Sequence, residues 1–263
     1  VVLCRYDDSG QELWRVALPG WDRGYVYDMQ VLPDSSVLLC GAQTSCDAEA
    51  EDRIFLARIN PDGSIRWHVY EGATTTPSPV GLYGVPMMTL DDLGRVCVLS
   101  IETMHTFDLE TGMYATSYTI PAPLNWECND LHFNVADQRF YLISTEGVER
   151  FDPLSGSLET VAGLAAPSVY YRKIVPLSGG NMLAYSESGA ALEFGPDGVV
   201  TTADWSSHGV QCITRSDDGR LAIYRDGHVF VYNAQYILKH QFELTNPGIG
   251  VFAMHWENNN LLL

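Results

Sequence analysis

Two aspartates, Asp28 and Asp130, have the residue type and the setting for acid–base chemistry. Each lies beside aromatic residues, in a segment that joins one repeated unit of the chain to the next. Paired carboxylates about 5 to 10 Å apart can cleave a glycosidic bond by general acid–base chemistry. One hypothesis is therefore an enzyme, an extracellular polymer-active lyase or glycoside hydrolase that uses these acids, although the sequence gives no distance between them.

Aromatic residues recur in the same joining segments. Tyr25, Tyr83 and Tyr170 have a common offset from the strands that follow them, and further aromatic, acidic and basic residues flank them. In the fold argued below, these segments gather on one face around a central channel, so the residues predict a binding pocket for a sugar, a peptide or a protein loop. An equally weighted alternative is that the aromatics only cover the junctions between units. The predicted ligand-binding set is Trp21, Tyr25, Tyr27, Asp28, Tyr83, Trp126, Asp130, Tyr170, Arg172 and His208.

Other catalytic signatures are missing from the sequence. It contains no G-x-S-x-G elbow, H-E-x-x-H helix, P-loop or G-x-G-x-x-G loop. The seven His residues are scattered, and the Asp-Asp pairs fall on expected turns, where aspartate accepts backbone hydrogen bonds. There is no Cys/His cluster at zinc spacing, although a bridge between Cys40 and Cys46 stays an open alternative. We therefore expect no catalytic residue outside the acid hypothesis, no metal and no cofactor.

The charge balance narrows the class of partner. The chain has 15 Lys plus Arg against 33 Asp plus Glu, a formal net charge of −18, and this acidity disfavours nucleic acid and anionic membranes. Its apolar runs are far shorter than the roughly 18 to 20 residues of a spanning helix, so no transmembrane segment is expected. The sequence begins with Val, and we expect any export signal to lie outside it.

The elements that would position these residues are short repeated β-hairpins. Arg53 to Gly72 reads as two strands joined at Pro61-Asp62-Gly63, and Val1 to Gly20 repeats the pattern, with Trp14 and Trp67 at the same offset after the turn glycine. Looser copies follow to the end of the chain. A second hairpin lies behind each copy, and the period of about 40 residues with four short strands per unit is typical of a β-propeller blade.

Counting the hairpins predicts a single domain over residues 1–263, an all-β, six-bladed β-propeller with four antiparallel strands per blade. The chain starts with the outer hairpin of a blade and stops in the inner hairpin of one. We therefore expect the strand around Leu261 to pair with the strand around Val2, so that the N- and C-terminal strands close one blade and remove two free edges. We expect the two tryptophans to pack between neighbouring blades, and Gly63 and Gly198 to adopt positive φ in matching turns.

The units at 1–20 and 53–72 resemble the quinoprotein-type (PQQ-type) propeller repeat, in which an aspartate-and-glycine turn is followed by an aliphatic residue and tryptophan. The matching residues are Asp8, Gly10, Leu13 and Trp14, and then Asp62, Gly63, Ile65 and Trp67. Quinoprotein dehydrogenases have eight blades and a vicinal cysteine pair, which this sequence does not have. The resemblance is therefore nearer to non-enzymatic propeller lipoproteins that scaffold outer-membrane assembly, and it implies a place outside the cytoplasm.

Together these patterns predict a non-enzymatic binding or scaffold propeller. We expect a module of a larger secreted or surface-anchored protein or lipoprotein, periplasmic in a Gram-negative cell, that binds protein, peptide or carbohydrate at its channel face. The polymer-active enzyme is the alternative. We expect the module itself to be monomeric.

Overall fold

The structure is a computed structural model, and it describes residues 2–6, 11–18, 24–43, 53–71, 86–100, 102–121, 130–144, 147–165, 171–186, 190–204, 212–216, 218–225, 227–235, 237–243, 255–257 and 260–262. These residues form β-strands and tight turns with one short 3₁₀ turn, Ser178–Gly180. Among them, no helix has the length and apolar character needed to cross a membrane. The chain divides into two compact units, Val1–Cys128 and Asn129–Leu263, each described by itself.

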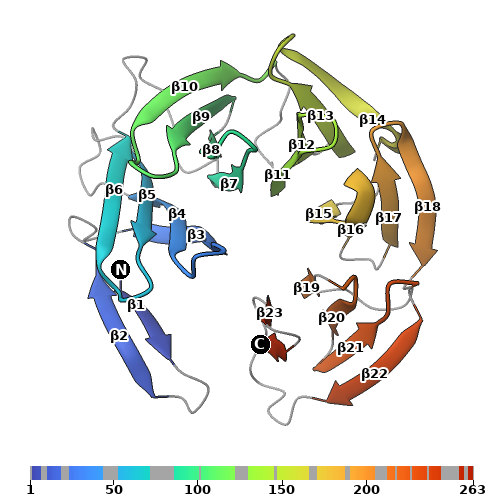
Figure 1. Ribbon diagram of the computed structural model, residues 1–263. Coiled ribbons are helices and arrows are strands. Elements are labelled where there is room, and N and C mark those ends of the chain that lie inside the picture. The colour runs from blue at the N-terminus through green and yellow to red at the C-terminus, as the bar shows by residue number, and fades with distance from the viewer. Residues whose placement is uncertain are drawn as a thin grey trace. The chain divides into compact units, whose positions relative to one another are not determined.

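The first unit contains one two-stranded and two four-stranded antiparallel sheets (Figure 1). In chain order the hairpin is β1 (Val2–Tyr6) and β2 (Glu12–Ala17), the first sheet is β3 (Gly24–Val31), β4 (Val37–Gln43), β5 (Arg53–Ile59) and β6 (Ile65–Glu71), and the second is β7 (Met87–Leu90), β8 (Arg95–Ser100), β9 (Thr103–Asp108) and β10 (Tyr114–Thr119).

The second unit contains three four-stranded antiparallel sheets and one hairpin. The sheets are β11 (Asp130–Asn134), β12 (Arg139–Ser144), β13 (Gly147–Asp152) and β14 (Ser157–Ala165); β15 (Tyr171–Pro176), β16 (Met182–Ser186), β17 (Ala190–Gly195) and β18 (Gly198–Asp204); and β19 (Cys212–Arg215), β20 (Leu221–Arg225), β21 (His228–Tyr232) and β22 (Leu238–Glu243). The hairpin is β23 (His255–Glu257) and β24 (Asn260–Leu262).

Each four-stranded sheet pairs its strands in sequence order, which is the predicted blade. The described residues contain five such blades, not the expected six, and they show no closing blade, because β1–β2 and β23–β24 form separate two-stranded sheets. The difference has a physical basis. A tight turn fixes the register inside a hairpin, whereas joining β24 to β1 requires pairing between opposite ends of the chain.

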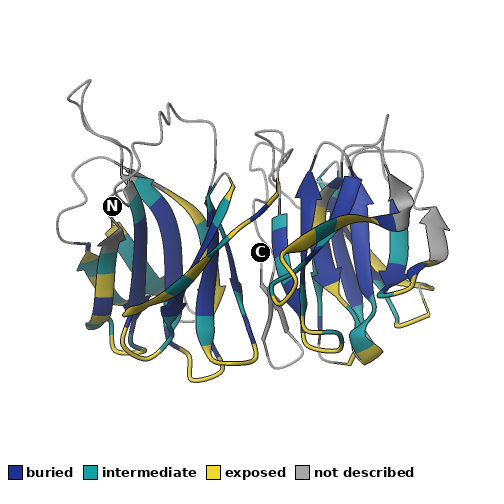
Figure 2. Ribbon diagram, turned by 90° about the horizontal axis from the view of Figure 1, so that it is seen from above, coloured by how far each residue is buried: buried dark blue, intermediate teal, exposed yellow. Residues whose placement is uncertain are grey.

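The core lies between neighbouring sheets. On β4, Leu38 packs toward the β7–β10 sheet with Val96 and Phe107, whereas the next residue, Leu39, packs in the cluster that includes Leu3 of β1. Successive strand residues point to opposite faces, so a strand with both faces covered becomes a continuous apolar run. Figure 2 shows the same distribution, with buried residues on the middle strands and exposed residues at the hairpin turns.

Each of the two repeat tryptophans packs on a glycine turn of the following sheet, as predicted. Trp14 lies against Gly63, and its Nε1–H donates to the Pro61 carbonyl oxygen at 2.8 Å. Trp67 lies in the same way against Gly112. Gly63 and Gly198 have φ of 86° and 116°, which confirms the predicted positive φ. The tryptophans therefore hold β1–β2 to the β3–β6 blade, and that blade to β7–β10.

Candidate functional site

The structure describes only part of the predicted binding set. Tyr27 and Asp28 lie on β3, and Asp130 begins β11. The backbones of Tyr25 and Arg172 lie on β3 and β15, but their side chains are outside the described part of the chain. The remaining predicted positions are outside the described residues altogether, and the face they would form stays a prediction: Trp21, Tyr83, Trp126, Tyr170 and His208.

Two of the predicted residues occupy β-bulges at the same place in their blades. The pairing of β3 with β4 passes from Val26 opposite Gly41 directly to Asp28 opposite Cys40, so Tyr27 is the extra residue. The pairing of β15 with β16 skips Arg172 in the same way. A bulge bends the first strand of a blade and re-aims the side chain that it carries, and bulges are frequent beside functional sites. Sequence alternation gave no sign of either bulge.

Tyr27 begins an exposed apolar strip on β3. We define the β3 strip as Tyr27, Met29 and Val31, with exposed fractions of 36%, 53% and 48%; Val26, whose ladder partner lies on the same face of β4 as those of Met29 and Val31, is also exposed, at 39%. The intervening Asp28 and the following Leu32 contact the β7–β10 blade, so the alternation of the strand turns Met29 and Val31 away from that blade. Met29 and Val31 were not in the predicted set, although their spacing on a strand was the available signal. The β3 strip is the most apolar exposed part of the described site.

Asp28 and Asp130 have matching structural contacts. Asp28 Oδ2 accepts a hydrogen bond from the Met88 backbone N–H on β7 at 3.2 Å, and Oδ1 accepts from the Met29 N–H at 2.8 Å. Asp130 Oδ2 accepts from the Ile174 N–H on β15 at 2.7 Å. Each carboxylate therefore ties the first strand of its blade to the first strand of the next.

This use of the oxygens limits the chemistry of both aspartates. A carboxylate that accepts from backbone N–H groups is fixed in place as an acceptor, and these charge-assisted bonds are among the stronger ones in proteins. The two acids lie in different units, Asp28 in the first and Asp130 in the second. Among the described residues, no group of three or more His, Cys, Asp or Glu side chains is arranged to hold a metal ion.

Of the two cysteines in the possible Cys40–Cys46 disulfide, the structure describes only Cys40. Cys40 is a free, buried thiol whose Sγ lies 4.0 Å from the Pro86 carbonyl oxygen. Burial raises the pKa of this thiol well above its ordinary value, with the charge of Asp28 adding to the effect. A raised pKa keeps the thiol protonated and unreactive, so Cys40 acts as a small core residue. Cys46 is outside the described residues.

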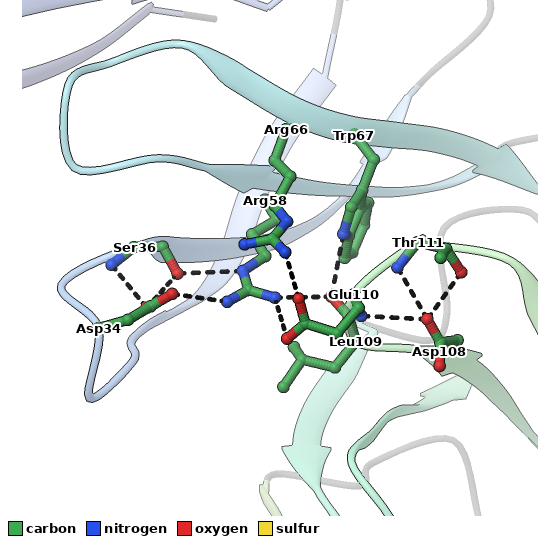
Figure 3. Close-up of polar contacts among 9 residues, drawn as sticks. All are labelled: Asp34, Ser36, Arg58, Arg66, Trp67, Asp108, Leu109, Glu110 and Thr111. Carbon is green, nitrogen blue, oxygen red and sulfur yellow. Dashed lines mark hydrogen bonds and ion pairs between the residues drawn. The ribbon is translucent and has the colours of Figure 1, made fainter.

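A buried arginine at the opposite end of the β3–β6 blade was missed by the sequence analysis. Arg58 on β5 is only 3% exposed, and it forms ion pairs of 2.8 Å with both Asp34 and Glu110 (Figure 3). Its Nε donates to Ser36 Oγ at 3.0 Å, and its Nη1 donates to the Leu109 carbonyl oxygen at 3.0 Å. Arg58 thus links the first turn of its own blade to the outer turn of the next.

The ionised state of the acids around Arg58 follows from these contacts. Hydrogen bonds from the Ser36 hydroxyl and backbone N–H, together with Arg58, lower the pKa of Asp34 to about 2. The hydrogen bond from Arg58 likewise lowers the pKa of Glu110, which also pairs with Arg66. The charges of the two arginines and the two acids are paired with one another, so the cluster stabilises the contact between the β3–β6 and β7–β10 blades.

Equivalent arginines occur in the β1–β2 hairpin and in the β11–β14 blade. Arg5 donates to the Pro61 carbonyl oxygen at 3.3 Å, and Arg150 donates to that of Pro196. In each case the arginine precedes an outer turn and the acceptor is in the outer turn of the following sheet. The recurrence of Arg shortly before an Asp or Asn turn residue was visible in the sequence, but only the packed blades show what it contacts.

These observations define the class of protein as an all-β propeller with four-stranded antiparallel blades. Solved structures that share this fold include the following three. A streptogramin B lyase is 12% identical with a TM-score of 0.69, covering 95% of this chain and 78% of its own. BamB from Moraxella catarrhalis is 16% identical with a TM-score of 0.55, covering 99% and 75%. The C-terminal WD40 domain of Sif2 is 11% identical with a TM-score of 0.62, covering 98% and 70%.

The likeness extends to the fold and no further at these identities. No protein-family model matches the chain, and no curated protein matches it. The general propeller prediction is therefore confirmed, whereas assignment to the quinoprotein-type repeat stays an expectation.

Proposed function

We propose that this chain is a non-enzymatic binding or scaffold propeller whose ligand is a polypeptide. The observation that carries the proposal is the β3 strip beside Asp28, where the acid is held by backbone N–H groups while Tyr27, Met29 and Val31 are exposed. In a propeller, the first strand of each blade borders the central channel, which is a common place for a ligand.

The shape of the exposed side chains favours a polypeptide over a sugar. Met29 and Val31 offer flexible aliphatic surface, which suits apolar side chains, and methionine adapts well to varied protein partners. Stacking of a sugar ring needs planar surface, and Tyr27 is the only aromatic member of the β3 strip. Of the expected ligands, protein and peptide are therefore preferred to carbohydrate.

An array experiment tests the proposal. The full chain is applied to peptide and glycan arrays, and its best ligand is then titrated against the Met29→Ser/Val31→Ser variant. Loss of these contacts should weaken binding by about 1 to 3 kcal/mol, the range of an interface hot spot, with little change in melting temperature because both side chains are exposed. The matched control is Leu154→Ser, which removes a 95% exposed leucine from a turn of another blade. Equal binding by all three proteins would refute a site on β3.

The enzyme alternative would use Asp28, beside the β3 strip, and Asp130, but no structural observation supports a catalytic role for either acid. A streptogramin B lyase is among the similar folds, yet fold alone does not transfer an activity. Both candidate acids contact backbone N–H groups of the next blade, which supports a structural role for them.

We also propose the finer features of the architecture and setting. The sixth blade would be completed by β24 pairing with β1. This closure and a ligand on the β3 strip are alternatives at one face, because β23 of the completed blade would cover the side of β3 that is turned away from β7–β10. In support of the closure, β1–β2 contacts the β3–β6 blade through Trp14 as β6 contacts β7–β10 through Trp67, and β23 lies beside β19 as β19 lies beside β15. The quinoprotein-like repeat supports an extracytoplasmic module of a larger secreted or surface-anchored protein or lipoprotein.

A further inference from the structure

The outer strand of the last complete blade, β22, differs from the outer strands β2 and β10. All six side chains of β22, Leu238 to Glu243, are exposed, whereas β2 and β10 each alternate exposed and half-buried residues. β22 pairs with β21 and with no other strand of the described residues, as the outer strand of every blade does, so what sets β22 apart is the exposure of its side chains. Leu238 and Phe242 are 46% and 43% exposed. A free, partly apolar edge is a template for pairing with another strand.

The charged side chains of β22 also have no partner in the described part of the chain. Neither Lys239 nor Glu243 forms an ion pair with any described residue, and Gln241 between them makes no side-chain hydrogen bond there. By contrast, Arg15 on β2 pairs with Glu12, and Glu159 on β14 pairs with Arg150. As far as the described residues go, the opposite charges on β22 are therefore left for an incoming strand.

We propose that β22 is a dimerisation edge, and that its occupant is β22 of a second copy of this chain. Antiparallel pairing about Gln241 places Lys239 opposite Glu243 of the other copy, and the two-fold symmetry produces this ion pair twice. The same register places His240 opposite Phe242. A shift by one residue places Lys239 opposite Phe242 and loses both ion pairs, so the charges select one register.

Local complementarity is needed because the whole chain has a formal net charge of −18, which opposes self-association. Lys239 is one of only two lysines, and it lies on this edge with His240 beside it. A bulge skips Lys239 in the pairing with β21, so the new ladder would be regular over 240–242, with the long Lys239 side chain reaching Glu243 at its end. The result is an isologous dimer with one continuous sheet across its axis.

This inference concerns assembly and does not rest on what the chain binds. It differs from the monomer expected from the sequence, which does not show that the side chains of β22 are exposed.

Charge exchange provides the test. The full chain, Lys239→Glu, Glu243→Lys and the double variant are compared by sedimentation velocity over a concentration series. We expect a dimer for the parent, a dimer dissociation constant raised about tenfold in each single variant, and recovery to within about threefold in the double variant, because two cross-strand pairs are reversed and then restored. The matched control, Lys173→Glu at the other lysine, should leave the dimer unchanged.

Each contrary result has a clear meaning. A parent chain that stays monomeric over the whole series overturns the proposal. So does a dimer that neither single variant weakens, or a double variant that fails to recover while its melting temperature matches the parent. Because all six side chains are exposed, the variants are expected to fold normally.

Discussion

The indole of Trp67 lies against Gly112, the glycine of the next outer turn, and its Nε1–H donates to the Leu109 carbonyl oxygen at 3.0 Å. A Cβ on Gly112 would lie 2.7 Å from the indole, so the contact needs a residue without a side chain. Trp14 and Gly63 repeat the relationship one blade earlier. The sequence repeat is thus a repeat of one contact between neighbouring sheets.

Gly112→Ala should destabilise the protein by about 2 to 3 kcal/mol, combining the cost of a side chain at positive φ with displacement of the indole. Gly94→Ala is the matched control, because both glycines have φ of 71° but a Cβ on Gly94 would have no heavy atom within 4 Å. It should cost only about 1 kcal/mol. Urea unfolding measures both. Equal losses would mean that the indole contact contributes nothing.

Arg58→Ala should lower the free energy of unfolding by about 2 to 4 kcal/mol, since it removes the buried partner shared by Asp34 and Glu110. Arg66→Ala removes an exposed partner of the same Glu110 and should cost at most about 1 kcal/mol. Thermal and urea unfolding of the two variants provide the comparison. If both variants lose a similarly small free energy of unfolding, Arg58 does not stabilise the contact between the two blades.

Asp28→Leu should destabilise the chain by about 1 to 3 kcal/mol, because the Met88 N–H loses its acceptor. Asp28→Asn keeps an acceptor oxygen and should lose less. Neither change should abolish ligand binding. If a polymer-cleaving activity is found and Asp28→Asn eliminates it while the melting temperature is unchanged, the enzyme alternative is correct.

Acid should destabilise the protein through His132. Burial lowers the pKa of His132 to about 4 from the ordinary 6.5, so between these values the unfolded chain binds a proton that the folded chain does not. Stability is therefore lost as pH falls through this window. His132→Gln should reduce the loss of stability in acid. It should not remove the loss completely, because burial also lowers the pKa of His105. The variant His68→Gln, which makes the same substitution at an exposed histidine, provides the mutational control.

Ring closure predicts that deletion of residues 255–263 exposes β1. Pairing with β24 would protect from hydrogen exchange the backbone N–H groups on the edge of β1 that does not pair with β2, and the deletion should release that protection in Leu3 to Arg5. Protection of β4, inside its own sheet, should change little. Identical exchange of β1 with and without the C-terminal hairpin would show that the blade is not closed in this way.

Local signals in the sequence determined the blade. The Pro61-Asp62-Gly63 turn, the alternation on either side and the offset of Trp67 act over a few residues, where turn chemistry and strand periodicity decide the structure. Four-stranded sheets and the tryptophan packing followed from these signals. The number of complete blades did not, because closure depends on pairing between distant ends.

The candidate site depended on tertiary structure for a different reason. The sequence could not show whether the Asp28 carboxylate faces a ligand or the Met88 N–H. That donor lies in the adjacent blade, so only the folded structure reveals it. The bulge at Tyr27 and the burial of Arg58 likewise depend on the neighbouring strand and turn. Sequence spacing fixes which residues share a strand, but the role of a polar side chain is set by partners that folding brings from elsewhere in the chain, 60 residues away for Asp28 and 52 for Arg58 and Glu110.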